Sequence, residues 1–155
     1  GRGFRWRRPA TFLGPTSGAM GYGLPAAIAA AIARPNRPVI ALAGDGGFAM
    51  TMSELETAVR ERARVVAIVF DNERYGTIWD HQEQRGAGEL ATDLGPIDFA
   101  AAARAFGANG VRVERDEEFE PALRDALAYA GPTVIHLLLD RRWVSIDRLL
   151  EPPEA

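Results

Sequence analysis

Continuous apolar runs alternate with segments of helical periodicity along most of the chain. Short continuous apolar runs are typical of strands that are buried on both faces of a parallel sheet. Such runs cover residues 39–43, 65–70 and 133–139, and a shorter strand is expected at Val111 and Val113. This alternation predicts an α/β fold: a doubly wound, mostly parallel sheet with helices on both faces.

The segments between these runs carry apolar residues at the spacing of a helix face and are expected to be helical: 24–33, 52–59, 99–106 and 119–127. Ser53 or Thr51 is expected to cap the second helix, and Asp98 the third. Gly107 is expected to end the third helix. The stretch 84–96, which contains three glycines, predicts a long loop of the kind that often covers a functional site.

Composition narrows the functional classes. The 155 residues suit one domain, and the absence of cysteine excludes disulfides and thiolate metal sites. The net charge of −3 gives no reason to expect a nucleic-acid or membrane partner. The short basic cluster is interpreted as solvated surface: Arg2, Arg5, Arg7 and Arg8. No apolar run is long enough to span a bilayer, so a cytoplasmic protein is expected.

The predicted organisation has three parts. Residues 1–17 form a lead-in from a missing upstream region, residues 18–140 form the functional domain, and residues 141–155 form a polar C-terminal tail. The chain opens at Gly1 and not at a methionine. We therefore expect it to be a fragment of a longer protein.

Small oxygen-bearing side chains follow two successive apolar runs. Asp45 stands among glycines after the first run, and Asp71 and Asn72 follow the second. In open parallel sheets, ligands bind at the carboxyl ends of strands, and oxygen ligands favour a hard cation such as Mg²⁺. A helix expected after Gly47 would direct its N-terminus at the same place, which favours a phosphate. Gly-Asp-Gly is also a common turn in which the aspartate merely caps the next helix.

A rival motif lies upstream. Residues 21–26 match the G-x-G-x-x-A dinucleotide fingerprint, and Asp45 follows at about the required distance. That fingerprint requires a buried strand directly before its first glycine, whereas a turn at residues 14–17 precedes Gly21. A nicotinamide-binding Rossmann domain is therefore the weaker interpretation.

Taken together, the motifs resemble those of thiamine-diphosphate-dependent enzymes, most closely the acetolactate-synthase-like group. Gly44-Asp45-Gly46 followed by Asn72 is similar to the G-D-G…N signature of that family, and the block at residues 18–27 is similar to its G-x-M-G-x-G-L-P-A-A block. The resemblance extends from Gly18 to about Leu139. It implies the thiamine-diphosphate-binding fold.

The resemblance also implies residue roles. Asp45 and Asn72 would bind Mg²⁺ through side-chain oxygens, and the backbone carbonyl of Arg74 would be a third ligand. The remaining implied cofactor contacts are Gly46 and Gly47 along the diphosphate, Tyr75, Gly76 and Thr77 closing over it, and Gly18, Ala19 and Met20 on the pyrimidine side.

Two positions depart from the family pattern. Asp71 stands where the family usually has a first asparagine, and it would either add negative charge near the site or cap the following turn. His81 stands where authentic acetolactate synthases have a substrate-channel tryptophan, while Trp79 lies two residues earlier. His81 is either a surface residue or part of the substrate pocket. His136 is expected to be a satisfied core histidine.

The resemblance implies an enzyme acting on 2-oxo acids as a carboligase or decarboxylase, a lyase or transferase that forms a homo-oligomer. A pyrimidine-binding domain, from upstream or from a partner subunit, would supply an activating glutamate that this chain lacks. The chain alone is therefore expected to be inactive. The sequence leaves FAD binding undetermined. A non-catalytic module that binds the cofactor or a partner chain is the alternative.

Overall fold

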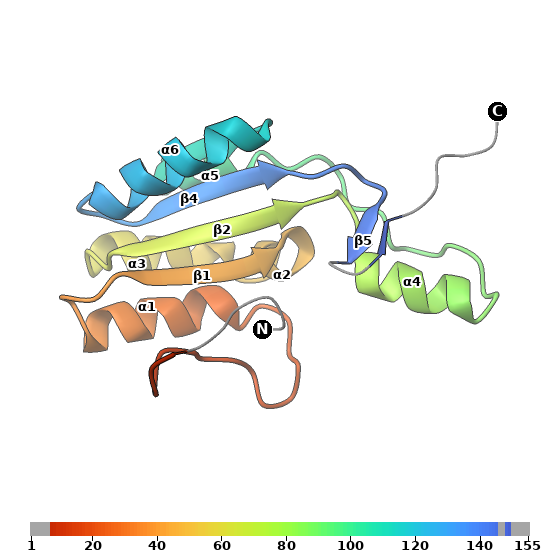
Figure 1. The fold of residues 1–155 in the computed structure, drawn as a ribbon, viewed down its shortest axis with the longest axis horizontal. Coiled ribbons are helices and arrows are strands. Elements are labelled where there is room, and N and C mark those ends of the chain that lie inside the picture. The colour runs from red at the N-terminus through yellow and green to blue at the C-terminus, as the bar shows by residue number, and fades with distance from the viewer. Residues whose placement is uncertain (1–6, 146–147, 150–155) are drawn as a thin grey trace.

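The computed structural model in Figure 1 describes residues 7–145 and 148–149. Arg2 and Arg5 of the predicted basic cluster, and residues 150–155 of the predicted tail, lie outside the described residues. The elements follow in the order α1 (Gly23–Ala33), β1 (Val39–Gly44), α2 (Asp45–Ala49), η1 (Met52–Glu54), α3 (Leu55–Arg60), β2 (Val65–Asp71), α4 (Gly76–Gln84), α5 (Phe99–Ala105), β3 (Asn109–Val113), α6 (Asp116–Ala128), β4 (Thr133–Leu138), β5 (Trp143–Ser145) and β6 (Arg148–Leu149).

The main sheet has four strands in the order β1-β2-β4-β3, and every pairing is parallel. β1 and β2 run in register from the pair Val39 and Val65 to the pair Gly44 and Phe70. The carboxyl ends of these two strands therefore lie next to each other. The predicted parallel α/β sheet, with helices on both faces, is confirmed.

Alternate residues of β2 face two separate cores. Val65, Ala67 and Val69 belong to a cluster with residues of α1, α3 and α5, while Val66 and Ile68 pack with residues of α6. In Figure 1, α6 lies across β4. A continuous apolar run is what a strand covered on both sides requires, so the run predicted the environment of β2 correctly.

β1 was expected to be buried on both faces, and this prediction is wrong. β1 is an edge strand that pairs only with β2 in the described sheet. Ile40 and Leu42 are 45% and 43% exposed, because α6 covers β2 and β4 but does not reach β1. Ala41, on the opposite face, is buried against α1.

The predicted helix-end residues are confirmed at both ends of α5 but not at the start of η1 and α3. The Asp98 side chain accepts a hydrogen bond of 2.8 Å from the N–H of Ala101, which confirms the predicted cap of α5. Thr51 does not cap η1, because its hydroxyl instead donates to the Gly21 carbonyl. Ser53 lies inside η1, and Glu54 takes the N-cap position of α3, so the prediction of a Thr51 or Ser53 cap is wrong. Gly107 adopts φ +86° directly beyond α5, as a helix-ending glycine does.

Two features extend beyond the predicted elements. α4 follows β2 at the carboxyl end of the sheet, and a small antiparallel pair, β5 and β6, lies in the region expected to be a tail. Figure 1 shows α4 and β5 together, beyond the carboxyl ends of β1 and β2. Strands of two or three residues are too short to show a periodic pattern, so this pair left no signal in the sequence. None of the described helices has the length and apolar character needed to cross a bilayer.

The close approach of β3 to α5 depends on a glycine. Gly110→Ala is expected to lower the free energy of unfolding by about 1–3 kcal/mol, because a Cβ there would stand 2.1 Å from the Ala100 carbonyl oxygen. Urea unfolding measures this loss. Gly95→Ala is the matched control: nothing lies within 4 Å of its Cβ position, so the change should stay within about 0.5 kcal/mol. Equal stabilities of the two variants would contradict the packing of β3 on α5.

Candidate functional site

The site is built where β1 and β2 end. Asp45 follows β1 as the first residue of α2, and Asn72 follows β2. One oxygen of the Asp45 carboxylate, Oδ2, accepts hydrogen bonds of 3.2 Å from the backbone N–H groups of Asn72 and Arg74. The other, Oδ1, accepts from the N–H of Gly46 at 2.6 Å. The carboxylate thus joins the two strand-end turns, as the sequence predicted from their positions. α2 begins at Asp45 and not after Gly47.

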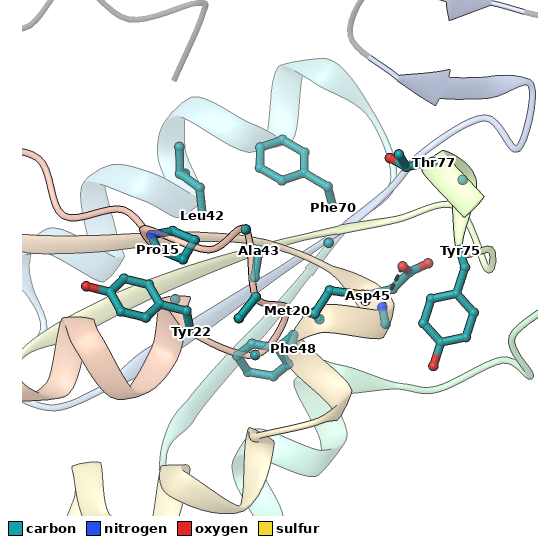
Figure 2. Close-up of a pocket in the computed structure, with 18 of the residues that line it drawn as sticks. Pro15, Met20, Tyr22, Leu42, Ala43, Asp45, Phe48, Phe70, Tyr75 and Thr77 are labelled. Atoms are coloured by element: carbon teal, nitrogen blue, oxygen red, sulfur yellow. Dashed lines mark hydrogen bonds between the residues drawn. The ribbon is translucent and has the colours of Figure 1, made fainter. Parts of the chain in front are cut away.

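These turns open onto a cavity of about 1170 Å³. Figure 2 shows Met20, Asp45 and Tyr75 around the same space, although they come from three separate segments. Every cofactor and substrate residue predicted from the sequence lines it: Gly18, Ala19, Met20, Asp45, Gly46, Gly47, Asn72, Arg74, Tyr75, Gly76, Thr77 and His81. Sequence reasoning missed an apolar part of the lining: Phe12, Leu13, Tyr22, Leu42, Phe70, Ile78, Leu139 and Trp143.

Apart from Tyr22, which lies within the glycine-rich block at residues 18–27, the missed residues belong to no motif. Leu42 and Phe70 read as ordinary strand residues, and both line the cavity only because the sheet face beside β1 has no helix over it. Both are also more than a third exposed. An apolar floor beside a polar strand-end corner is the usual composition of a site for an organic cofactor.

Asp45 is only 5% exposed, and its pKa reflects this. Burial raises the pKa of the Asp45 carboxyl above its ordinary value, and the neighbouring carboxyl of Asp71 raises it further. The N–H groups of Gly46 and Arg74 oppose the shift without reversing it. A buried carboxylate of this kind is stabilised by a cation placed beside it.

Asp71 behaves in the opposite way because it has a partner. Burial again opposes its charge, but the hydrogen bond with His136 and the N–H of Glu73 bring the pKa of Asp71 below its ordinary value. His136 Nε2 lies 2.6 Å from Asp71 Oδ2, and the His136 side chain is 1% exposed. Asp71 Oδ1 also accepts the N–H of Glu73 at 2.9 Å, which confirms that it caps the turn.

His136 lies in the core, as predicted, but it is only partly satisfied. Its Nε2 is bonded to Asp71, whereas the buried Nδ1 has no hydrogen-bond partner among the described residues. Its ring also contacts the Phe99 ring edge to face, with centroids 5.2 Å apart. Its other nitrogen, Nδ1, lies 3.9 Å from Asp98 Oδ1. The Asp71 carboxylate is thus hydrogen-bonded to a side chain of the protein interior and not to a group in the cavity.

A hydrogen bond to the C-terminal segment orients the side chain of Asn72. Asn72 Nδ2 donates a hydrogen bond of 2.6 Å to the backbone carbonyl of Trp143, the first residue of β5. This bond leaves the amide oxygen of Asn72 as the atom available to a ligand. The carbonyl of Trp143 could not be identified beforehand, because a backbone contact of this kind depends on where the chain returns in space.

Gly46 lies against an aromatic ring. A Cβ on Gly46 would stand 2.2 Å from Cε1 of Tyr75. The missing side chain therefore lets the Tyr75 ring close over α2, as well as leaving space beside the cavity. The glycine pair was expected to leave room for a diphosphate or to form a turn, and the contact with Tyr75 adds a further reason for Gly46.

The upstream glycine segment packs beside α2: a Cβ on Gly47 would lie 3.8 Å from the backbone nitrogen of Gly21. Gly18 and Gly21 adopt φ +69° and +80°, which side chains disfavour, and the Gly21 carbonyl is held by the Thr51 hydroxyl at 3.0 Å. No strand precedes Gly21 among the described residues. The dinucleotide fingerprint therefore lacks the strand that it requires, which argues against the Rossmann interpretation.

His81 and Trp79 of α4 point differently, as their spacing predicts. Trp79 is buried, whereas His81 is exposed and lines the cavity. His81 is thus both a surface residue and a cavity residue, so the two interpretations of it are compatible. Glu54 is an ordinary helix residue that accepts a hydrogen bond from the Thr57 hydroxyl at 2.9 Å.

The donor atoms decide which ion could fit. Among the described residues, no group of three or more His, Cys, Asp or Glu side chains is placed to hold a metal. The corner offers one carboxylate, one amide oxygen and the backbone carbonyl of Arg74, which also accepts the N–H of Gly76 at 2.8 Å. Mg²⁺ is commonly held by one or two carboxylates together with substrate phosphates and water. The residues therefore fit Mg²⁺ bound together with a phosphate group.

Comparison with known proteins gives consistent matches. The family model described as thiamine pyrophosphate enzyme, C-terminal TPP binding domain, matches residues 1–137. The chain is 39% identical over 123 residues to the catabolic acetolactate synthase of Raoultella terrigena, covering 79% of this chain and 22% of that protein. It is 40% identical over 129 residues to the sulfoacetaldehyde acetyltransferase of Castellaniella defragrans, covering 79% and 21%.

A solved structure matches as well. The benzoylformate decarboxylase of Polynucleobacter necessarius superimposes with a TM-score of 0.84 at 34% identity, covering 89% of this chain and 27% of that chain. The chain therefore spans roughly a fifth to a quarter of the length of these relatives.

The two acids should affect stability with opposite dependence on pH. Because the pKa of Asp45 is raised, its stabilising contribution is present below 3.8 and lost as pH rises through its folded pKa. Because the pKa of Asp71 is lowered, its contribution is present above 3.8 and lost as pH falls through its folded pKa.

Urea unfolding of the ligand-free chain from about pH 3 to about pH 7 tests this. The parent should lose stability relative to Asp45→Asn as pH rises, and relative to Asp71→Asn as pH falls. Changes of the same sign in both variants would contradict the opposed environments of the two carboxyls.

Proposed function

Because the chain belongs to the thiamine pyrophosphate enzymes, as their C-terminal TPP-binding domain, we propose that its cavity binds thiamine diphosphate together with Mg²⁺. One observation carries the proposal. Asp45 and Asn72 come from the ends of two paired parallel strands and meet through a hydrogen bond of 3.2 Å at the cavity wall.

We assign Mg²⁺ to three oxygen donors: the carboxylate of Asp45, the side-chain oxygen of Asn72 and the backbone carbonyl of Arg74. The fit rests on two features. The bond from Asn72 Nδ2 to Trp143 leaves the Asn72 oxygen for the ion. The raised pKa of the buried Asp45 carboxyl marks a carboxylate that a cation would stabilise.

The cofactor contacts follow from the lining of the cavity. Gly46 and Gly47 would lie along the diphosphate, and Gly18, Ala19 and Met20 would face the pyrimidine. Tyr75, Gly76 and Thr77, at the start of α4, would close over the diphosphate. The cavity supplies few cations of its own, so an added divalent ion would provide most of the charge that a diphosphate requires.

Thiamine diphosphate supplies, when bound, an electron-accepting ring that stabilises the carbanion left when a 2-oxo acid loses carbon dioxide. This chain's residues contribute binding and orientation. Asp45, Asn72 and the turn that follows would fix the diphosphate end, while Met20, Leu42 and Phe70 present apolar surface to the rest of the cofactor. We therefore assign the complete enzyme to 2-oxo acid chemistry, as a decarboxylase or carboligase.

His81 is the proposed contact with substrate. It is exposed on α4, lines the cavity and stands beyond the turn that would hold the diphosphate. Its imidazole nitrogens could serve as a hydrogen-bond donor or acceptor to a substrate.

The cavity is open on an apolar side, and we propose that the pyrimidine-binding domain of a homo-oligomer covers it. Met20, Phe70 and Ile78 are 47%, 39% and 46% exposed and all line the cavity. A partner domain over them would bury this surface and bring the activating glutamate that the chain itself lacks. The chain alone would then be inactive, and turnover of benzoylformate or pyruvate by the isolated chain would contradict this.

Asp45→Ala tests the cation assignment. The variant should abolish Mg²⁺-dependent binding of thiamine diphosphate, because it removes the only carboxylate among the three proposed ligands. Calorimetric titration of the parent and the variant, each in the assembled form in which the parent binds, measures the effect. Asp125→Ala, an exposed carboxyl on α6 far from the strand ends, is the matched control and should bind like the parent. Unchanged affinity of Asp45→Ala would refute the assignment.

A further inference from the structure

The turn at residues 72–75, which carries the proposed cation ligands, contains an unfavourable backbone conformation. Glu73 adopts φ +56°, a region that residues other than glycine rarely occupy. Such a conformation persists where neighbouring structure holds it in place. Contacts with the loop after α4 hold this turn in place.

The loop after α4 holds the turn through backbone hydrogen bonds. The N–H of Tyr75 donates to the Thr92 carbonyl at 2.8 Å, and the N–H of Leu94 donates to the Glu73 carbonyl at 2.9 Å. Arg74 and Asp93 form an isolated antiparallel bridge between these bonds. Thr92 is 1% exposed, so this contact is part of the folded interior. Residues 92–94 thus lie alongside residues 73–75 as a short extended pair.

The side chain of Arg74 adds charged contacts to the same loop. It is only 12% exposed, and its Nη2 and Nε lie 3.3 Å and 3.5 Å from carboxylate oxygens of Glu89 and Asp93. Its guanidinium carbon lies 4.8 Å from the centroid of the Trp79 ring, which it covers as a cation–π pair. Asp93 also pairs with Arg141, just before β5. We call Arg74, Glu89 and Asp93 the arginine clasp.

The side chains of the clasp would not contact the cation. They could still affect cation binding, because Arg74 carries both the clasp guanidinium and the backbone carbonyl proposed as a ligand. Residues 85–96 contain no helix or named strand, so their attachment to the turn depends on the paired backbone and on the clasp. The Arg74 guanidinium also brings a positive charge close to a proposed cation site. Glu89 and Asp93 offset that charge, so that it would not repel the ion.

We propose that the Arg74 side chain is a positioning group, which holds the loop at residues 89–94 against the turn at residues 72–75 and so fixes the Arg74 carbonyl and Asn72 for cation binding. This inference rests on the proposed function, since it assumes that the turn binds Mg²⁺. Groups that orient metal ligands typically change metal affinity by about 10–100-fold when they are removed.

Arg74→Met is the test. Methionine keeps the backbone carbonyl and an unbranched side chain beside Trp79, but it removes both ion pairs. In the intact protein that carries this sequence, saturated with thiamine diphosphate, the dissociation constant of Mg²⁺ should rise about 10–100-fold. Asp93→Asn should weaken Mg²⁺ binding in the same direction. The double variant should lose less than the product of the two single losses, because both act through one clasp.

Arg124→Met is the matched control, because Arg124 forms an exposed pair with Glu120 on α6 and should leave Mg²⁺ affinity unchanged. Thiamine diphosphate affinity at saturating Mg²⁺ separates positioning from general damage, and it should stay within about threefold of the parent in Arg74→Met. Unchanged Mg²⁺ affinity in Arg74→Met, or an equal loss of affinity for both ligands, would overturn the positioning role. Absence of Mg²⁺ binding by the parent itself would instead overturn the proposed function.

Discussion

The parallel pairing of β1 with β2 is the constraint on which the site depends. Its register brings Gly44 level with Phe70, so Asp45 lies beside Asp71, the last residue of β2, and Asn72 is the first residue beyond that strand. Residues 27 positions apart in sequence then share a hydrogen bond through the Asp45 carboxylate. The two cores, packed on opposite faces of β2, hold this register by burying alternate residues of one strand. The register of the sheet thus determines which residues meet at the site, and their side chains determine what the site can bind.

Charge at this corner is divided between two carboxyls with different tasks. Asp71 has a buried hydrogen-bond partner in His136, which helps to lower the pKa of its carboxyl. Asp45 accepts hydrogen bonds from three backbone N–H groups, and its pKa is raised by burial and by the neighbouring Asp71 carboxyl. It is therefore the carboxyl that would gain most from a cation in the cavity. The arrangement explains how an acid can stand at position 71 without competing for the role assigned to Asp45.

The sequence predicted the parts of the molecule that local pattern determines. Three continuous apolar runs and the shorter pattern at Val111 and Val113 predicted the four strands of the main sheet. Because strand ends in a parallel sheet converge, the sequence also predicted that Asp45 and Asn72 would lie close together, and the structure brings them together. The exposure of Ile40 and Leu42 was not predictable, since an edge strand and a central strand can carry the same run. The bond from Asn72 to the Trp143 carbonyl and the contacts of Arg74 with Glu89 and Asp93 depend on where distant loops return. No local pattern records such contacts.

The central claim is that Asp45 and Asn72 hold one divalent cation together with the diphosphate of the cofactor. Mn²⁺ can replace Mg²⁺ at oxygen sites, and its anomalous scattering locates it directly in crystals of the intact protein grown with thiamine diphosphate. The account predicts a single strong peak at this corner, about 2.0–2.3 Å from side-chain oxygens of both residues and from a diphosphate oxygen. A cofactor-associated peak that contacts neither Asp45 nor Asn72 would contradict it.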